Sequence, residues 1–255
     1  MSAARPPLLE VAANSVASAL AAQEGGASRI ELCGALELGG LTPSYATIAI
    51  ARERLSIPLY VLIRPRSGDF LYSDLECEAM QRDIETCVAL GCDGVVLGAL
   101  DAQGQVDRLR CRALIACAGR LGVTFHRAFD VTQNPSQALE AVIELGCERV
   151  LTSGARASAL DGAAQIRALL AQAAGRVIVM PGAGLNPRNI ARLARSTGAR
   201  ELHASAKRQL PSRMRHRRLD MEDMAAGEWR TDAAQVRAMV GALESLATPE
   251  AAPPP

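Results

Sequence analysis

Short apolar runs alternate with amphipathic stretches along almost the whole chain, and each run ends at polar residues, glycine or proline. Uninterrupted apolar runs are typical of strands buried on both faces, as in parallel sheets. Several of the stretches between them open on a residue that caps helices, such as Ser73 or Asn134. The predicted strands cover residues 8–11, 29–33, 59–63, 94–97, 123–126, 149–152, 176–180 and 201–203.

A helix is predicted after every one of these strands. Eight strand–helix units in a chain of 255 residues predict an α/β fold of the (β/α)8 TIM-barrel class, with one domain over residues 8–247. We expect the Pro/Ala-rich tail, 248–255, to be disordered. A doubly wound open sheet is the rival, but no Gly-x-Gly-x-x-Gly pattern follows the first strand. The predicted helices cover residues 15–20, 42–54, 75–90, 107–118, 134–145, 160–173, 186–196 and 232–246.

A weak internal repeat supports the barrel. A glycine followed by alanine or cysteine precedes every second strand, and two units per repeat are expected of four-fold pseudo-symmetry. Cys92 and Cys147 occupy the small position of this repeat, so we interpret them as packing residues at the amino-terminal face. The repeat is found at residues 26–30, 91–95, 146–150 and 198–202.

Composition narrows the class of protein. Apolar residues make up 49% of the chain, charged residues 22%, and the formal net charge is +1, which gives no indication of nucleic-acid or membrane binding. The start of the chain shows no apolar signal-peptide core, and the seven cysteines include no Cys-x-x-Cys pair. We therefore expect a cytoplasmic protein with reduced thiols.

Polar side chains interrupt the apolar strands in a consistent pattern. Charged groups inside strands are costly unless they are paired, so side chains from several strands are expected to meet near the barrel axis. One interpretation is a binding or catalytic pocket at the carboxyl end of the barrel, and the other is a buried ion-pair network that only fills the interior. The side chains concerned are Glu10, Glu31, Cys33, Arg64, His126, Thr152 and His203.

The fifth strand ends directly at His126 and Arg127, followed by Asp130. A base, a cation and an acid after a buried strand indicate a site. The loops after the seventh and eighth strands, with Gly182, Gly184 and Ser205, are where barrels commonly bind phosphate. The basic run 208–218 is expected to form a mobile loop over the barrel mouth, with His216 in solvent.

Several longer motifs of the chain resemble those of the CutC family, a family linked by name to copper homeostasis. The resemblance implies a TIM barrel, a cytoplasmic location and a homo-oligomer, such as a homodimer. The matching segments, which lie between Glu10 and Lys207, are Ile-Glu-Leu-Cys (30–33), Gly-Gly-Leu-Thr-Pro (39–43), Ile-Arg-Pro-Arg (63–66), Gly-Asp-Phe-Leu-Tyr-Ser-Asp (68–74), Thr-Phe-His-Arg-Ala-Phe-Asp (124–130), Arg-Val-Leu-Thr-Ser-Gly (149–154) and Val-Met-Pro-Gly-Ala-Gly (179–184).

The resemblance also implies a copper function, because some family members are described as binding Cu(I) through cysteines. One such position matches Cys33, whereas two others are Ala12 and Ala204 here. The soft donors expected near the mouth are therefore Cys33, Met180, His126 and His203.

Three functions stay open at this point. The first is copper handling at Cys33. The second is an enzyme for a small anionic or phosphorylated metabolite, with His126, Glu31, Asp130 and Arg64 as catalytic candidates. The third is a scaffold without catalytic activity. A Schiff-base mechanism is not expected, since the only lysine, Lys207, lies beyond the eighth strand. The predicted ligand- and anion-binding residues are Glu10, Arg64, Arg66, Thr152, Ser153, Gly182, Gly184, His203 and Ser205.

Overall fold

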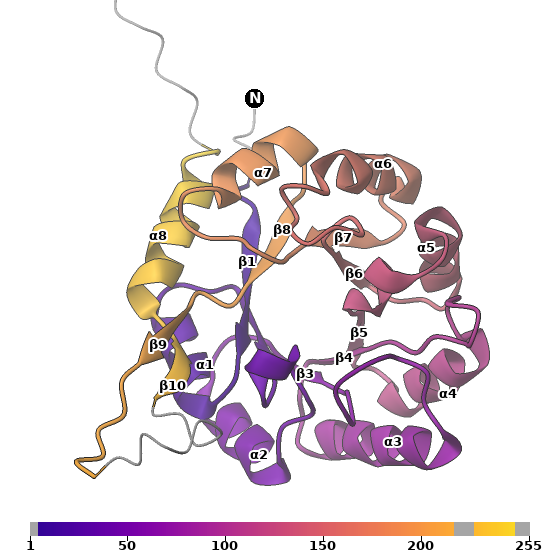
Figure 1. Ribbon diagram of the computed structural model, residues 1–255, viewed down its shortest axis with the longest axis horizontal. Coiled ribbons are helices and arrows are strands. Elements are labelled where there is room, and N and C mark those ends of the chain that lie inside the picture. The colour runs from indigo at the N-terminus through magenta and orange to yellow at the C-terminus, as the bar shows by residue number, and fades with distance from the viewer. Residues whose placement is uncertain (1–4, 217–226, 248–255) are drawn as a thin grey trace, which may run out of the picture.

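The computed structural model describes residues 5–216 and 227–247 of the protein. Eight parallel strands surround a central axis in the order β7-β6-β5-β4-β3-β2-β1-β8. β7 and β8 lie next to one another and complete the ring, and the helices form an outer layer (Figure 1). The fold is therefore the predicted TIM barrel. The strands are β1 (Leu8–Ala13), β2 (Arg29–Leu32), β3 (Leu59–Leu62), β4 (Gly94–Leu97), β5 (Gly122–Phe125), β6 (Arg149–Thr152), β7 (Ile178–Pro181) and β8 (Glu201–Ala204).

The helices follow the strands as the sequence predicts, with most boundaries shifted by a few residues. α2 begins at Tyr45 because Ser44, rather than Thr42, caps it, and α7 begins at Ile190 rather than beside Pro187. Ser73 and Glu76 form a complete capping box at the start of α3. The helices are α1 (Val16–Glu24), α2 (Tyr45–Arg54), α3 (Asp74–Ala89), α4 (Arg108–Ala118), α5 (Pro135–Glu144), α6 (Ala163–Ala173), α7 (Ile190–Thr197) and α8 (Ala233–Glu244), with 3-10 helices η1 (Leu36–Leu38) and η2 (Arg127–Val131).

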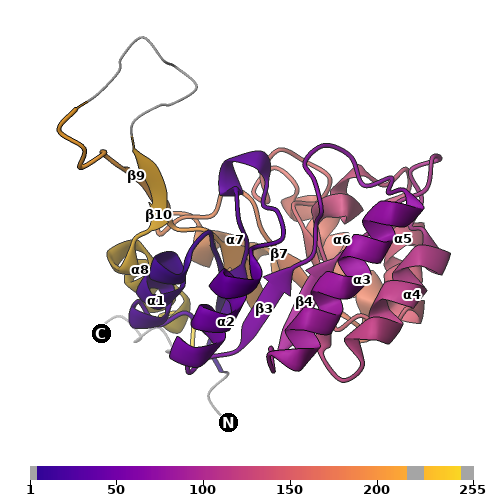
Figure 2. The ribbon, with the colours of Figure 1, turned by 90° about the horizontal axis from the view of Figure 1, so that it is seen from below.

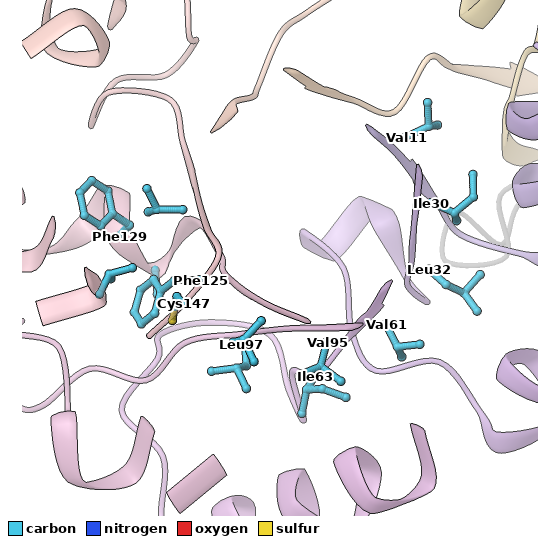
Figure 3. Packing of buried hydrophobic residues seen from close by; sticks show 14 of the residues in the cluster. Val11, Ile30, Leu32, Val61, Ile63, Val95, Leu97, Phe125, Phe129 and Cys147 are labelled. Carbon is cyan, nitrogen blue, oxygen red and sulfur yellow. The ribbon is translucent and has the colours of Figure 1, made fainter. Parts of the chain in front are cut away.

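The main hydrophobic core lies between the strands and the helices, not inside the barrel. Outward-facing side chains such as Val11, Ile30, Val61 and Leu97 are fully buried there against the helix layer (Figure 3). A separate, smaller apolar cluster of Cys33, Tyr60, Leu62 and Val96 lies apart from it. Alternation along each strand therefore leaves polar side chains pointing inward.

The basic run does not begin as a loop. Residues Lys207–Leu210 form β9, which pairs antiparallel with β10 (Glu228–Thr231) in a two-stranded ribbon. Figure 2 shows this ribbon rising from the end of the barrel at which the long connecting loops lie. Two predicted segments lie outside the described residues, namely residues 217–218 of the expected mobile loop and the tail 248–255.

None of the described helices is long and apolar enough to cross a bilayer.

Candidate functional site

A network of paired charges fills the amino-terminal part of the barrel. Arg29 donates hydrogen bonds to Glu10 and to Glu201, the latter at 2.6 Å. Arg149 binds the same Glu201 carboxylate at 2.7 Å and the Tyr60 hydroxyl at 3.2 Å. The two guanidinium groups each lie 5.2 Å from the centre of the Tyr60 ring. These contacts pair the buried charges with one another, so this layer supports the structure and offers no free group to a ligand.

Space for Tyr60 comes from two glycines on neighbouring strands. A Cβ atom at Gly94 would lie 2.1 Å from the Tyr60 ring, and one at Gly122 would lie 2.2 Å from its hydroxyl oxygen. β4 and β5 can therefore begin only with glycine here, because any side chain would displace the ring that the two arginines pack against.

Above this layer, His203 lies between two carboxylates. Its Nδ1 is 2.8 Å from Glu10 Oε1 and 3.6 Å from Glu31 Oε2. Burial alone would raise the pKa of Glu10, but the hydrogen bond with His203 and the charge of Arg29 outweigh it and lower the pKa to about 2. Burial would lower the pKa of His203, yet the charges of Glu31 and Glu10 raise it. Both shifts favour the charged forms, a protonated His203 beside an ionised Glu10.

Glu31 differs from Glu10 because no arginine binds it. Burial, reinforced by the negative charge of Glu10, raises the pKa of Glu31 to about 7, although His203 and Arg29 oppose this. Its Oε2 atom is buried without a hydrogen-bond partner among the described residues. A carboxyl group with these properties can both take up and release a proton near neutral pH.

Glu31 and His203 line a cavity of about 580 Å³ at the carboxyl end of the strands. Most of the predicted site residues meet there. The predicted residues that do not line the cavity include Glu10, Thr152, Ser153 and Gly182. Glu10 binds His203, and Thr152 and Ser153 bind Asp130. A Cβ atom at Gly182 would lie 3.2 Å from His203. The predicted residues that line the cavity are Glu31, Cys33, Arg64, His126, Asp130, Gly184, His203 and Ser205.

Two predicted residues are placed elsewhere. Arg66 is partly exposed, binds Asp69 and Glu76, and does not line the cavity. Met180 is buried outside the cavity, and its sulfur lies 3.5 Å from an Arg29 nitrogen of the ion-pair layer. Arg66 is held by partners three and ten residues further along the chain, whereas Met180 lies against a residue that is 151 positions away in sequence.

Arg64 reaches the cavity as a buried cation that lacks a carboxylate partner among the described residues. Its terminal nitrogens donate to the carbonyl groups of Leu38, Gly40 and Gly68 at 2.9–3.0 Å, and its Nε atom has no acceptor. The guanidinium carbon lies 5.1 Å from the centre of the Phe70 ring. These contacts fix the position of the guanidinium group without neutralising its charge.

His126 directly follows β5, whose last residue is Phe125, and caps η2. Its Nδ1 accepts a hydrogen bond from the backbone N–H of Ala128 at 3.2 Å, while Nε2 is buried without a partner. Burial and the positive charge of Arg64 lower the pKa of His126 to about 3. The ring, which lies 5.0 Å from that of Phe70, is therefore neutral and carries its proton on Nε2.

Asp130 is fully occupied by hydrogen-bond donors. Its carboxylate accepts from the Thr152 hydroxyl at 2.5 Å, from the Ser153 and Ala155 N–H groups at 2.9 and 3.1 Å, and from Arg127 at 2.8 Å. These bonds connect η2 to the loop after β6. Asp130 therefore acts as a clamp that positions the cavity wall, and the acid/base role we expected for it has no free lone pair to work with.

Replacing this clamp should cost stability. In Asp130→Asn, an amide N–H₂ group faces donors that previously bound an anion, so we expect the free energy of unfolding to fall by about 2–3 kcal/mol. Urea denaturation measures this. The control Asp69→Asn changes a side chain that is 73% exposed and should alter stability little. Equal effects of the two substitutions would contradict the clamp.

The loops after β7 and β8 adopt the open backbone expected of an anion site. Ala183 and Gly184 both have positive φ, at 82° and 76°, and Ala206 has a φ of 45°. Among the described residues, no acceptor binds the N–H groups of Ala183 and Gly184. Ser205 lines the cavity beside them. Successive free N–H groups at positive φ can bind an anion, which keeps these loops candidates for phosphate.

Lys207 lies beyond the eighth strand, as the sequence predicts, on β9. It nevertheless lines the cavity, and its Nζ lies 4.9 Å from the centre of the Trp229 ring of β10. Sequence reasoning did not include it among the site residues. Its position just after the eighth strand was the available signal, but the strand pairing that holds it there involves residues more than twenty positions away.

Comparisons with known proteins agree with the motifs. The CutC family model matches residues 7–208. A protein of Xanthomonas axonopodis pathovar citri, named family protein CutC, is 61% identical over 236 residues, which is 92% of this chain and 98% of that protein. A protein of the same name from Chromobacterium violaceum is 55% identical and covers 93% of this chain and 98% of its own length.

Solved structures show the same fold. The CutC protein of Streptococcus agalactiae, whose name connects it with copper homeostasis, has a TM-score of 0.75 at 32% identity and covers 78% of this chain and 98% of its own. Phosphoribosylanthranilate isomerase of Thermotoga maritima, at 11% identity and a TM-score of 0.55, covers 94% of this chain and 99% of its own. At that identity the likeness concerns the fold alone.

Proposed function

The chain belongs to the CutC family, and from the cavity at the mouth of its barrel we propose that it is an enzyme that binds a small anionic metabolite and transfers a proton on it. The observation that carries this proposal is Arg64. A buried guanidinium group without a carboxylate partner is unfavourable in a free protein, because its charge is removed from water and not compensated. A bound anion in the cavity would supply the missing charge.

A second cation supports an anionic ligand. Lys207 lines the cavity and has no carboxylate partner among the described residues. Its ammonium group lies over the Trp229 ring instead. With Arg64, it gives the cavity two cations that no acidic side chain in the described part of the chain pairs with. A carboxylate or a phosphate group is the ligand that these cations favour.

Glu31 supports the proton transfer. Its pKa of about 7 is suited to general acid/base catalysis, and its free oxygen belongs to a cavity-lining side chain. His203 positions this carboxyl group and is itself held by Glu10. His126, which we expected to shuttle protons, is better suited to donate a hydrogen bond, since it stays neutral.

Copper handling is the second candidate, supported by the family's name and by Cys33, whose thiol is on the cavity wall. The donors present do not fit a Cu(I) site well. Burial and the charges of Glu31 and Glu37 raise the pKa of Cys33, which disfavours the thiolate. Met180 does not line the cavity. The group of His, Cys, Asp and Glu donors that converges among the described residues is Glu10, Glu31 and His203, which offers oxygen and nitrogen but no sulfur.

The cavity also contains the positions at which some family members carry further cysteines. Ala12 and Ala204 line it together with Cys33, so this chain has one thiol where three would be possible. Tight Cu(I) binding by the reduced protein in an anaerobic titration would favour the copper candidate over the enzyme. The cytoplasmic location and the homo-oligomer stay predictions.

Arg64 provides the test of the proposed function. In a thermal-shift and calorimetric screen of sugar phosphates, sugar acids and α-keto acids, we expect at least one compound to bind and stabilise the protein. Arg64→Met should weaken that binding about 10–100-fold, because a charge-assisted hydrogen bond is lost. Arg64→Lys keeps the positive charge and should weaken binding of the compound less. If the Met variant does not fold, the Lys variant still tests the role of the guanidinium group.

Arg66→Met is the matched control, since Arg66 is two residues away but does not line the cavity. It should leave the affinity within about threefold of the wild type. Binding that survives both Arg64 substitutions, or that Arg66→Met weakens equally, would contradict the proposal.

A further inference from the structure

The tautomer of His126 is fixed by the backbone. Nδ1 accepts the Ala128 N–H at 3.2 Å because His126 occupies the N-cap position of η2. A neutral imidazole that accepts at Nδ1 must donate at Nε2. The ring is also held between Phe70 and Phe125, whose centroids lie 5.0 and 6.1 Å from it. His126 therefore presents one N–H donor in a fixed direction.

That donor has no partner within residues 5–216 and 227–247. Nε2 is buried and unbonded among the described residues, and the side chain is only 5% exposed on the wall of the cavity. A buried donor without an acceptor is costly in a folded protein and calls for an explanation. An oxygen atom of a bound ligand would provide the acceptor.

The surroundings favour a neutral donor over a proton shuttle. Arg64 lies close enough to oppose protonation of His126, and burial acts in the same direction, so the pKa is about 3. A neutral imidazole N–H can stabilise an oxygen atom that becomes negative during a reaction, without giving up its own proton. Carbonyl oxygens become negative in this way when a proton leaves the neighbouring carbon.

We propose that the substrate carries a carbonyl group near its anionic group, and that His126 is the electrophile that polarises this carbonyl while Glu31 removes the proton from the adjacent carbon. The Glu31 carboxylate takes the proton, and the electrons of the C–H bond form a C=C bond. The carbonyl π electrons move to the oxygen, where the negative charge is held by the His126 N–H. Protonated Glu31 then returns the proton to carbon, so the step is an enolisation without oxidation or reduction.

This inference rests on the proposed function and narrows its substrate class to anionic aldehydes or ketones. The arrangement separates three tasks among three side chains of one cavity. Arg64 binds the anionic group, Glu31 moves the proton and His126 stabilises the enolate oxygen. Lys207, the only amine side chain of the chain, suggests a competing route in which a carbonyl substrate forms an imine with its Nζ.

The test is exchange of α-protons in D2O, followed by proton NMR, with dihydroxyacetone phosphate, ribulose phosphate and pyruvate as probes. We expect the full-length protein to catalyse exchange in at least one probe that binds. His126→Phe, which keeps an aromatic ring but has no donor, should slow exchange about 100–1000-fold with little change in the dissociation constant. His126→Gln, whose amide N–H₂ group can reach the position of Nε2, should recover part of the rate.

His216→Phe is the matched control, because His216 is exposed and does not line the cavity. The His216→Phe variant should catalyse exchange of the probe's α-protons at the wild-type rate. Exchange that His126→Phe leaves unchanged would overturn the inference and leave the proposed function standing. Probes that bind through Arg64 but never exchange would overturn the inference and leave only the anion binding of the proposed function supported. Cyanoborohydride trapping of a covalent adduct on Lys207 would also overturn it. If none of the probes binds, the proposed function fails first and this inference fails with it.

Discussion

Replacing Glu31 with glutamine is expected to stabilise the protein at about pH 8 while removing its activity. The folded state raises the pKa of Glu31 from 4.5 to about 7, so the folded protein binds this proton more tightly than the unfolded chain does. The stability that this provides is fully present below pH 4.5 and is lost as the pH rises through 7. A shift of this size corresponds to about 3 kcal/mol. Glutamine is never ionised, so Glu31→Gln avoids this loss.

The groups that face Glu31 come from three strands and are His203, Glu10 and Arg29. Among them, His203 and Arg29 favour ionised Glu31, and Glu10 opposes it. Urea denaturation between pH 4 and 8 should show a gain in stability for Glu31→Gln that grows with pH and vanishes in acid. Proton exchange on a bound probe should fall by about 100–10,000-fold.

Glu37→Gln is the control, because Glu37 is exposed. It should change neither the stability of the protein nor the rate of proton exchange. A loss of stability in Glu31→Gln at every pH would show that Glu31 belongs to a purely structural network. The same result would remove the reason to regard it as a catalytic base. Stability gained together with activity lost is the behaviour of a residue retained for function.

The second large effect is expected at Arg29. Arg29→Met leaves the carboxylates of Glu10 and Glu201 buried and removes part of the positive charge that compensates them. Breaking a buried pair in this way costs about 3–5 kcal/mol. Thermal and urea unfolding would measure the loss. Arg82→Met, which breaks an exposed helix pair with Glu78, should cost less than about 1 kcal/mol.

A stable Arg29→Met variant would mean that the lower layer of the barrel does not depend on ion pairing. The double variant Arg29→Met with Glu10→Gln provides a further check. Removing both partners should restore part of the stability, because the uncompensated charge disappears.

The sequence was sufficient to predict the barrel and much of the cavity wall. Strand positions follow from apolar runs, and a polar residue inside such a run, as at Glu31 or His203, has to face the interior or a partner. Parity then places Glu31 of β2 and Cys33, which directly follows this strand, on one face. This reasoning needs only local information, and for that reason it succeeded.

Other features depend on contacts between distant segments. Arg29 looked like a residue at the entry to a strand, but its role depends on Glu201, which lies 172 positions away. The position of Lys207 on the cavity wall depends on pairing between β9 and β10. Arg66 and Arg64 have the same parity on their segment, yet only Arg64 lines the cavity, because Arg66 is bound outside it by Asp69 and Glu76, which are nearby in sequence. Parity alone does not show which of two such side chains finds a local partner.

The measurement that tests the account most directly is nitrogen NMR of the histidine rings as a function of pH. The chain has only three histidines, His126, His203 and His216, so each ring can be assigned by substitution. Our account predicts that His126 stays a neutral Nε2–H tautomer from about pH 5 to 8, and that His203 loses its proton only above the usual pKa of 6.5. A His126 ring that titrates near pH 6.5, or that carries its proton on Nδ1, would contradict the account, because the cavity would then lack the fixed neutral donor beside Arg64.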